Sequence, residues 1–274
     1  MPENPFPGSG AYPRRVVNDV AGWMELVQAY STSKPKRLLA EGDSWLAYPQ
    51  ILGSKNITLQ LADNYDDMIL LCLATSGDEA VAMLSSLSNK APLMSALRDY
   101  DFDFLLFSGG GNDIVGAWDF DFLLKEKASG MNWQDCIHAE RFDRRLDQIR
   151  NAYLDLLEYT FLYSRNKKIK VVTHTYDYPI PDPKGVVGGK SWMYPYLMAK
   201  KITDKSDQKN IAKYFMNRFA EMLAEVAKSP VAQSRFQVVN TFGLVKADEW
   251  ANEIHPTAKG FKKIAKKIYV ESLK

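Results

Sequence analysis

The sequence predicts a doubly wound α/β fold: a single three-layer αβα domain whose middle layer is a five-stranded parallel sheet. Five short apolar runs show no internal alternation, which is typical of strands buried on both faces. Helical patterns separate these runs, and strands that alternate with helices form parallel sheets with right-handed crossovers. A chain of 274 residues is long enough for one such domain.

The first 34 residues are expected to form a Pro- and Gly-rich arm and a helix that pack on the domain, which itself spans residues 35–274. The strands are expected where apolar side chains run together, at 37–40, 68–73, 102–107, 169–174 and 236–240. Helical periodicity predicts helices at 17–30, 58–64, 79–88, 138–165, 208–227 and 258–273. A Pro- and Gly-rich excursion over 175–191 follows the fourth strand, and loops of this length are often functional. This order indicates a flavodoxin-like sheet.

The composition excludes several classes of protein. Thirty-five basic and 33 acidic residues leave a net charge of +2, so nothing electrostatic favours nucleic acid or an anionic membrane as partner. Two distant cysteines, Cys72 and Cys136, do not form a disulfide framework. The chain shows neither a secretory signal nor an apolar run long enough to span a bilayer, which predicts a cytoplasmic protein.

Polar residues gather where the predicted strands end. In a parallel sheet these carboxyl ends share one edge, and ligands bind outside that edge. The first strand is followed by Gly42-Asp43-Ser44, the second by Thr75-Ser76-Gly77 and the third by the segment SGGGND at 108–113. The segment after the fifth strand carries Asp248, Glu249, Asn252, Glu253 and His255. One edge of the sheet is thus expected to hold a hydroxyl, a carboxamide, a histidine and several acids.

These groups suit acyl transfer. A serine hydroxyl such as that of Ser44 is a weak nucleophile unless a base lies within hydrogen-bond reach, and a histidine such as His255 is the usual base. The tetrahedral intermediate needs donors aimed at its oxyanion, which backbone N–H groups and the Asn112 side chain can provide. The two other histidines, His138 and His174, have no partner suggested by spacing and are interpreted as structural.

Other motifs do not fit. The stretch GGKS at 188–191 lacks the first glycine of a phosphate loop, because Lys184 stands at that position. The G-x-S-x-G turn of α/β-hydrolases is absent around Ser44, where Leu46 replaces the second glycine. Three scattered histidines and two cysteines give no metal-ligand spacing. Neither a metal nor a cofactor is expected.

The order of these blocks resembles the SGNH hydrolases, also called GDSL-type esterases and lipases, over residues 37–260. The resemblance implies that Ser44 in EGDSW is the nucleophile and that His255 before Pro256 is the base. It also implies an oxyanion hole formed by the N–H groups of Ser44 and Gly77 and by the carboxamide of Asn112 in the G-x-N-D block.

One position departs from this pattern. Asn252 stands where the family has an aspartate that orients the histidine. An asparagine can orient the ring but brings no charge to stabilise an imidazolium. The sequence leaves open whether Asn252, a backbone carbonyl, or one of the acids at 248, 249 and 253 takes this role.

The sequence therefore predicts a serine esterase that acts on a small-molecule ester through an acyl-enzyme, and it gives no indication of the oligomeric state. Trp45, Tyr48 and Trp118 are candidates for lining the site. One alternative is a carbohydrate O-acetyl esterase, in which aromatic side chains near the rim stack on sugars. The other alternative is a catalytically silent binding module, which the departure at Asn252 favours.

Overall fold

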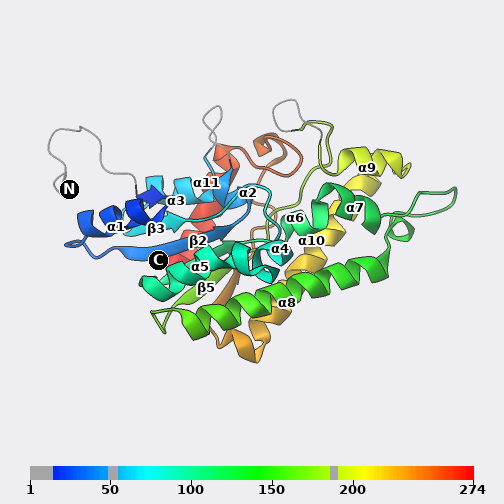
Figure 1. The fold of residues 1–274 in the computed structure, drawn as a ribbon. Helices are drawn as coiled ribbons and strands as arrows, with labels where there is room; N and C mark the ends of the chain where they lie inside the picture. Colours follow the sequence, from blue (N-terminus) through cyan, green and yellow to red (C-terminus); the bar gives the residue numbers. More distant parts are fainter. Residues whose placement is uncertain (1–14, 49–54, 186–190) are drawn as a thin grey trace.

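A computed structural model describes residues 15–48, 55–185 and 191–274, and of Ala117 and Trp118 it describes the backbone alone. Six parallel strands form one sheet in the order β1-β3-β2-β4-β5-β6. Figure 1 shows this sheet between two layers of helices. The strands are β1 (Val16–Val17), β2 (Lys36–Gly42), β3 (Met68–Cys72), β4 (Phe104–Ser108), β5 (Lys170–His174) and β6 (Phe236–Val239).

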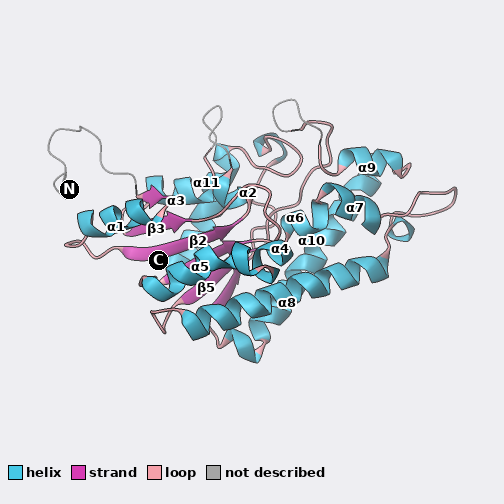
Figure 2. Ribbon diagram, in the orientation of Figure 1, coloured by secondary structure: helices cyan, strands magenta, loops and turns pink. Residues whose placement is uncertain are grey.

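Helices cover both faces of the sheet (Figure 2). One face carries α1 (Val20–Ala29), α3 (Ile57–Asn64) and α11 (Ala258–Ile268), which ends in the π-helical turn η5 (Tyr269–Leu273). The other face carries α4 (Ala80–Ser85), α5 (Leu87–Asp99), α8 (Ala139–Tyr163) and α10 (Lys205–Lys228). The shorter helices are α2 (Ser44–Ala47), α6 (Gly111–Val115), α7 (Ala117–Leu123), α9 (Tyr194–Ala199), η2 (Gln134–Cys136), η3 (Pro230–Ala232) and η4 (Ala247–Glu249).

The predicted fold class is confirmed, and the five expected strands are present in the flavodoxin-like order. The sheet has one strand more than predicted, because the two-residue β1 pairs with β3 and is too short to produce a sequence pattern. The helix expected at 79–88 is in fact two helices that meet at Ser86, whose backbone is extended. The second of them, α5, contains Pro92, a residue that argues against a helix interior in any sequence pattern.

The described parts of the chain contain no helix that is both long enough and apolar enough to cross a membrane. Cys72 and Cys136 are both buried and unpaired. The predicted boundary between residues 34 and 35 stays a prediction, although β1 and α1, which precede it, both contact β3.

The centre of the sheet is β2, which pairs with β3 on one side and β4 on the other. At its carboxyl end the backbone N–H of Asp43 donates to the carbonyl of Ser108 at 2.9 Å, and Thr75 N–H donates to the Gly42 carbonyl at 2.9 Å. Gly42 has φ +139°, and a Cβ there would lie 1.9 Å from the Ser108 oxygen. Only glycine lets the chain leave β2 this close to β4.

We predict that Gly42→Ala destabilises the protein strongly, because the substitution combines backbone strain with a backbone clash. The expected loss in unfolding free energy is about 2–5 kcal/mol. The matched control is Gly130→Ala, since Gly130 also has positive φ but nothing within 4 Å of an added Cβ. Strain alone there costs about 1–2 kcal/mol. Urea unfolding measures both, and equal losses in the two variants would contradict the packing argument.

Candidate active site

Ser44 lies at the carboxyl end of β2, as the first residue of the short helix α2. Asp43 is the N-cap of that helix, and its Oδ1 accepts a hydrogen bond from Trp45 N–H at 3.0 Å. Aspartate is a favoured N-cap because its carboxylate satisfies a free N–H of the first turn. The Gly-Asp-Ser sequence therefore turns the chain out of the strand and holds the Ser44 side chain at the edge of the sheet.

The structure brings Ser44, His255 and Asn252 into one hydrogen-bonded row. The Ser44 Oγ lies 2.7 Å from His255 Nε2, and His255 Nδ1 lies 3.0 Å from Asn252 Oδ1. Both His255 and Asn252 come from the loop between η4 and α11, in which Ala251 N–H donates to the His255 carbonyl at 2.8 Å. This contact folds the loop back on itself, so residues three apart in sequence face each other.

The contacts of Asn252 determine the tautomer of His255. Asn252 Oδ1 also accepts from the backbone N–H groups of Ile254 at 3.1 Å and His255 at 2.9 Å, so the amide oxygen faces the ring. An oxygen at this place requires a proton on Nδ1, which leaves Nε2 free to accept from the Ser44 hydroxyl. Burial lowers the pKa of His255 to about 3, so the ring is neutral near pH 7. This is the protonation state that a general base needs.

Aromatic rings surround the histidine. The ring of Tyr48 lies 4.4 Å from that of His255, and its hydroxyl accepts from Asn252 Nδ2 at 3.3 Å. Trp192, from the segment before α9, meets the His255 ring edge-on at 5.5 Å. Tyr48, predicted to line the site, thus supports both the histidine and its partner.

The three acids that the sequence left open have other surroundings. Asp248 is exposed. Glu249 pairs with Lys263 at 2.5 Å and Lys259 at 3.1 Å, and the hydrogen bond from Lys263, with help from Lys246 N–H and Lys259, lowers the pKa of Glu249 to about 2. Of the alternatives, the side chain that contacts His255 Nδ1 is Asn252.

Glu253 is buried and points toward the loop before α9. Its carboxylate accepts the backbone N–H groups of Trp192, Met193 and Tyr194, the last two at 2.8 Å. Burial raises the pKa of Glu253, and these backbone donors oppose the shift. Glu253 therefore holds the Trp192 segment in place beside His255.

The two other predicted oxyanion groups differ in their positions. Asn112, in α6, lines the same pocket as Ser44, and its Nδ2 donates to the Asp78 carbonyl at 2.8 Å. Gly77 is exposed, has φ +95° and is not among the residues that line this pocket. Asp113 is buried and accepts from the N–H groups of Ala80 and Val81, which fixes α6 against the start of α4.

Of the other two residues predicted to line the site, Trp45 lies at the pocket, whereas the side chain of Trp118 is not described. Trp45 is buried against the pocket, stacks on His174 at 5.3 Å and donates from Nε1 to the Ile254 carbonyl at 3.1 Å. It thereby ties α2, which carries Ser44, to the loop that carries His255. Trp118 is the second residue of α7, and its side chain lies outside the described residues.

Sequence reasoning missed a buried network beneath Ser44. Asp43 accepts hydrogen bonds from the hydroxyls of Tyr176 at 2.5 Å and Ser108 at 2.8 Å, in addition to Trp45 N–H. Burial raises the pKa of Asp43 to about 6, although all three donors oppose the shift. Tyr176 follows β5 at the same edge as the other groups, so the rule that found Ser44 and Asn112 was sufficient to find it.

Tyr176 adopts an uncommon backbone conformation, with φ +59°. Its carbonyl accepts from the Thr241 hydroxyl at 2.5 Å and from the Thr175 hydroxyl at 3.1 Å. A non-glycine residue in this region costs about 1–3 kcal/mol and persists where its surroundings hold it. Here those contacts point the tyrosine ring into the pocket and its hydroxyl at Asp43.

His174, interpreted from sequence as structural, belongs to this network. Its Nδ1 accepts from Tyr176 N–H at 3.1 Å, so Nε2 carries the proton and donates to Ser108 Oγ at 3.1 Å. Burial lowers the pKa of His174 to about 3. The ring is therefore a neutral, fully bonded core histidine.

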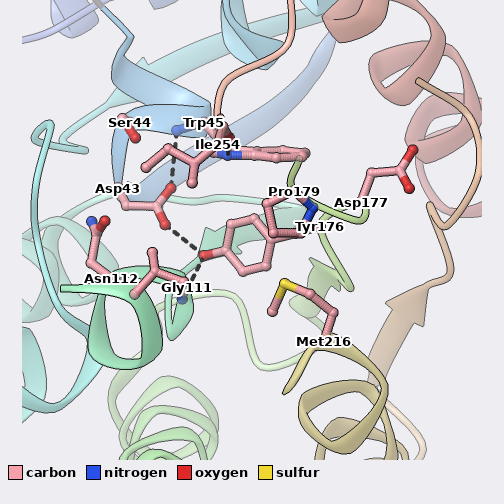
Figure 3. A pocket seen from close by; sticks show the side chains of 11 residues that line it. Asp43, Ser44, Trp45, Gly111, Asn112, Tyr176, Asp177, Pro179, Met216 and Ile254 are labelled. Carbon is pink, nitrogen blue, oxygen red and sulfur yellow. Dashed lines mark hydrogen bonds between the residues drawn. The ribbon is translucent and has the colours of Figure 1, made fainter. Parts of the chain in front are cut away.

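Figure 3 shows the pocket that these elements enclose. Ser44 and Asn112 lie on one side of the view, and Met216 and Pro179 lie across from them. The pocket is lined by Asp43, Ser44, Trp45, Gly111, Asn112, Val115, Tyr176, Asp177, Pro179, Met216 and Ile254. Among the described residues, no group of three or more His, Cys, Asp or Glu side chains is placed to hold a metal ion.

Comparison with known proteins relates this architecture to solved structures. No family model matches the sequence, and no curated protein matches it either. The chain superposes on phospholipase A1 from Streptomyces albidoflavus with a TM-score of 0.54 and 13% identity, over 87% of this chain and 100% of that one. It superposes on Axe2, an acetylxylan esterase from Geobacillus stearothermophilus, with a TM-score of 0.51 and 12% identity, over 86% and 93%.

The chain has the SGNH hydrolase fold. A member of the lipolytic G-D-S-L family from Veillonella parvula also superposes on it, with a TM-score of 0.48 and 13% identity over 87% of this chain and 99% of that one. In this fold the Gly-Asp-Ser turn, the G-x-N-D turn and the histidine loop follow β2, β4 and β6, which places Ser44, Asn112 and His255 at one edge of the sheet.

We predict that His174 makes the protein less stable in mild acid. Its pKa in the folded state lies below the ordinary value of 6.5, so as pH falls below 6.5 the unfolded chain binds a proton that the folded protein excludes. This lowers the unfolding free energy by about 1.4 kcal/mol per pH unit. His174→Gln keeps a donor and an acceptor but does not titrate.

The difference in unfolding free energy between wild type and His174→Gln is therefore expected to narrow as pH falls from 6.5 to about 4.5. Urea unfolding at several pH values measures it. His138→Gln is the comparison variant: partial burial and nearby cations lower the pKa of His138 in the same direction, and a smaller narrowing is expected there. A difference that stays constant with pH would show that His174 is not held neutral.

Proposed function

We propose that this protein is a serine esterase that hydrolyses a small-molecule carboxylic ester through an acyl-enzyme. The observation that carries the proposal is the row Ser44–His255–Asn252, with distances of 2.7 Å and 3.0 Å and with Nε2 facing the hydroxyl. A serine, a base within hydrogen-bond reach and a group that orients the base together form the arrangement of a nucleophilic catalyst.

In the acylation step, His255 Nε2 takes the proton of Ser44 as Oγ attacks the ester carbonyl. The ring becomes an imidazolium, and Asn252 Oδ1 keeps its hydrogen bond to Nδ1–H throughout. His255 then gives the Nε2 proton to the departing alkoxide, so the alcohol leaves neutral and the acyl group stays on Ser44. Water then attacks the acyl-enzyme while His255 Nε2 takes its proton, and His255 returns that proton to Ser44 Oγ as the acid leaves.

Donors at the oxyanion come from two elements. The Asn112 amide has two N–H bonds, of which one donates to the Asp78 carbonyl, and the other remains available to the substrate oxygen. The Ser44 N–H, in the first turn of α2, is the second proposed donor. Gly77 stays a proposal from the family pattern: it is exposed, and it directly precedes Asp78, whose carbonyl accepts the hydrogen bond from Asn112.

The neutral Asn252 changes the energetics of the base. An aspartate in this place would stabilise the imidazolium by charge, whereas an amide oxygen supplies a hydrogen-bond acceptor alone. The low pKa of the buried His255 agrees with this, because desolvation is not offset by a nearby anion. We infer that the site works by positioning a weak base accurately rather than by raising its basicity.

The likeness to an acetylxylan esterase and to a phospholipase A1, both ester hydrolases by name, supports the reaction class and leaves the substrate open. A carbohydrate O-acetyl esterase is the second candidate, favoured by the aromatic rings of Tyr48 and Trp192, which both contact His255. The contact of Asn252 with Nδ1 weighs against a silent binding module, because the departure at this position leaves the row intact.

We predict that Ser44→Ala lowers the hydrolysis of p-nitrophenyl acetate by about 10⁴-fold or more, because the nucleophile is removed. The melting temperature is expected to stay close to that of wild type. A fluorophosphonate probe, which reacts with activated serines, is expected to label wild type and not the variant.

Ser206→Ala is the matched control, since Ser206 is an exposed serine in the first turn of α10. Hydrolysis that survives in Ser44→Ala would remove this serine from the mechanism. A wild type that neither hydrolyses esters nor reacts with the probe would favour the silent binding module.

We predict that two substitutions of Asn252 change different kinetic quantities, kcat in one variant and the pH dependence of kcat/KM in the other. Asn252→Ala leaves His255 Nδ1 and two backbone N–H groups without their acceptor, and kcat is expected to fall by about 10²-fold or more. Asn252→Asp keeps the acceptor and adds a charge, which raises the pKa of His255. His255 then stays protonated up to a higher pH, so the acid limb in the profile of kcat/KM against pH shifts to higher pH by about 1–2 units.

Profiles of kcat/KM against pH for wild type and Asn252→Asp measure this shift. An aspartate variant with the wild-type acid limb would mean that residue 252 does not interact with the base. An alanine variant of normal kcat would likewise remove Asn252 from the row.

A further inference from the structure

The pocket beside Ser44 is small. Its solvent-accessible volume is about 30 Å³, whereas a single water molecule needs roughly 10–15 Å³ by the same kind of measure. Space for about two water-sized groups accommodates the methyl end of an acetyl or propionyl group, and because the pocket opens to solvent, the rest of a longer acyl chain would have to extend out of it. A site for fatty acyl chains would need several times this volume.

The pocket lies on the acyl side of the nucleophile. Ser44 and Asn112, the proposed nucleophile and oxyanion donor, both line it, whereas His255, Tyr48 and Trp192 do not. The leaving oxygen must lie within reach of His255, which protonates it. The alcohol therefore leaves on the histidine side, and the acyl group points into the pocket on the other side.

The lining offers apolar surface to that acyl group. Val115, Met216 and Ile254 contribute aliphatic side chains. The two carboxylates in the wall are already occupied: Asp177 accepts from the N–H groups of Tyr178, Gly243 and Val245, and Asp43 accepts from Trp45, Tyr176 and Ser108. A methyl group fits the apolar part of this wall, in which both carboxylates already accept hydrogen bonds from the protein.

Two lining side chains, Tyr176 and Met216, differ in how they are held. Tyr176 cannot move aside, because its hydroxyl is bound to Asp43 and its ring lies 3.0 Å from where a Cβ on Gly111 would stand. Met216, on α10, is buried and is held by packing, since no hydrogen bond depends on its unbranched side chain. Truncating Met216 would therefore deepen the pocket without disturbing the polar network.

We propose that this protein is specific for short acyl groups of two or three carbons, and that Met216 sets the limit. The proposal rests on the proposed esterase function and adds the acyl class to it. It is independent of the alcohol, which lies on the other side of Ser44.

The test measures kcat/KM for p-nitrophenyl acetate, propionate, butyrate, hexanoate and octanoate, which share one leaving group. Wild type is expected to lose about 10-fold or more between acetate and hexanoate, because one misfitting methylene costs about 10–200-fold. Met216→Ala is expected to raise the hexanoate-to-acetate ratio by about 10-fold. Met222→Ala is the matched control, since Met222 is a buried methionine of the same helix that does not line the pocket.

Melting temperatures of both methionine variants show whether they fold. Val115→Ala is the substitute if Met216→Ala does not fold, because it removes less volume from the same wall. It is expected to raise the hexanoate-to-acetate ratio as well. Ser44-dependent activity that rises with chain length in wild type would overturn the proposal and leave the esterase function standing. An equal shift in the Met222 control would overturn the role of Met216. Absence of Ser44-dependent hydrolysis at every chain length would overturn both proposals.

Discussion

The close approach of β2 to β4 at Gly42 and Ser108 is the constraint on which the site depends. Gly42 lets the two backbones meet, and Asp43 N–H then bonds the Ser108 carbonyl. The same two residues meet again through their side chains, where the Ser108 hydroxyl donates to the Asp43 carboxylate. Ser44 is therefore positioned by two adjacent strands of a parallel sheet, which are among the most rigid parts of such a domain.

Much of this arrangement follows from sequence because continuous apolar runs and short polar turns are strong local signals. The five predicted strands and the common edge of Ser44, Asn112 and His255 required nothing more than the alternation of strands and helices. The partner of His255 Nδ1 did not follow from sequence, because it depends on the backbone of one loop. Four side chains there were chemically plausible, and the Ala251–His255 backbone bond selects Asn252.

Other features left no sequence signal at all. Two residues are too few to mark β1 as a strand, and Pro92 hides α5 from any helical pattern. The positive φ of Tyr176 is held by a tertiary hydrogen bond from Thr241 and a local one from Thr175, and tyrosine is not a residue that predicts such a backbone. The pairing of β1 with β3 and the hydrogen bond from Thr241 to Tyr176 join segments far apart in sequence, so periodicity and turn propensity carry no information about them.

Residues 252 and 253 are neighbours whose side chains serve different parts of the molecule. Asn252 contacts the imidazole, and Glu253 binds the backbone of the Trp192 segment. The backbone of one short loop therefore sets the orientation of the imidazole and the position of the Trp192 segment together, so a substitution that shifts this loop would displace both walls of the site.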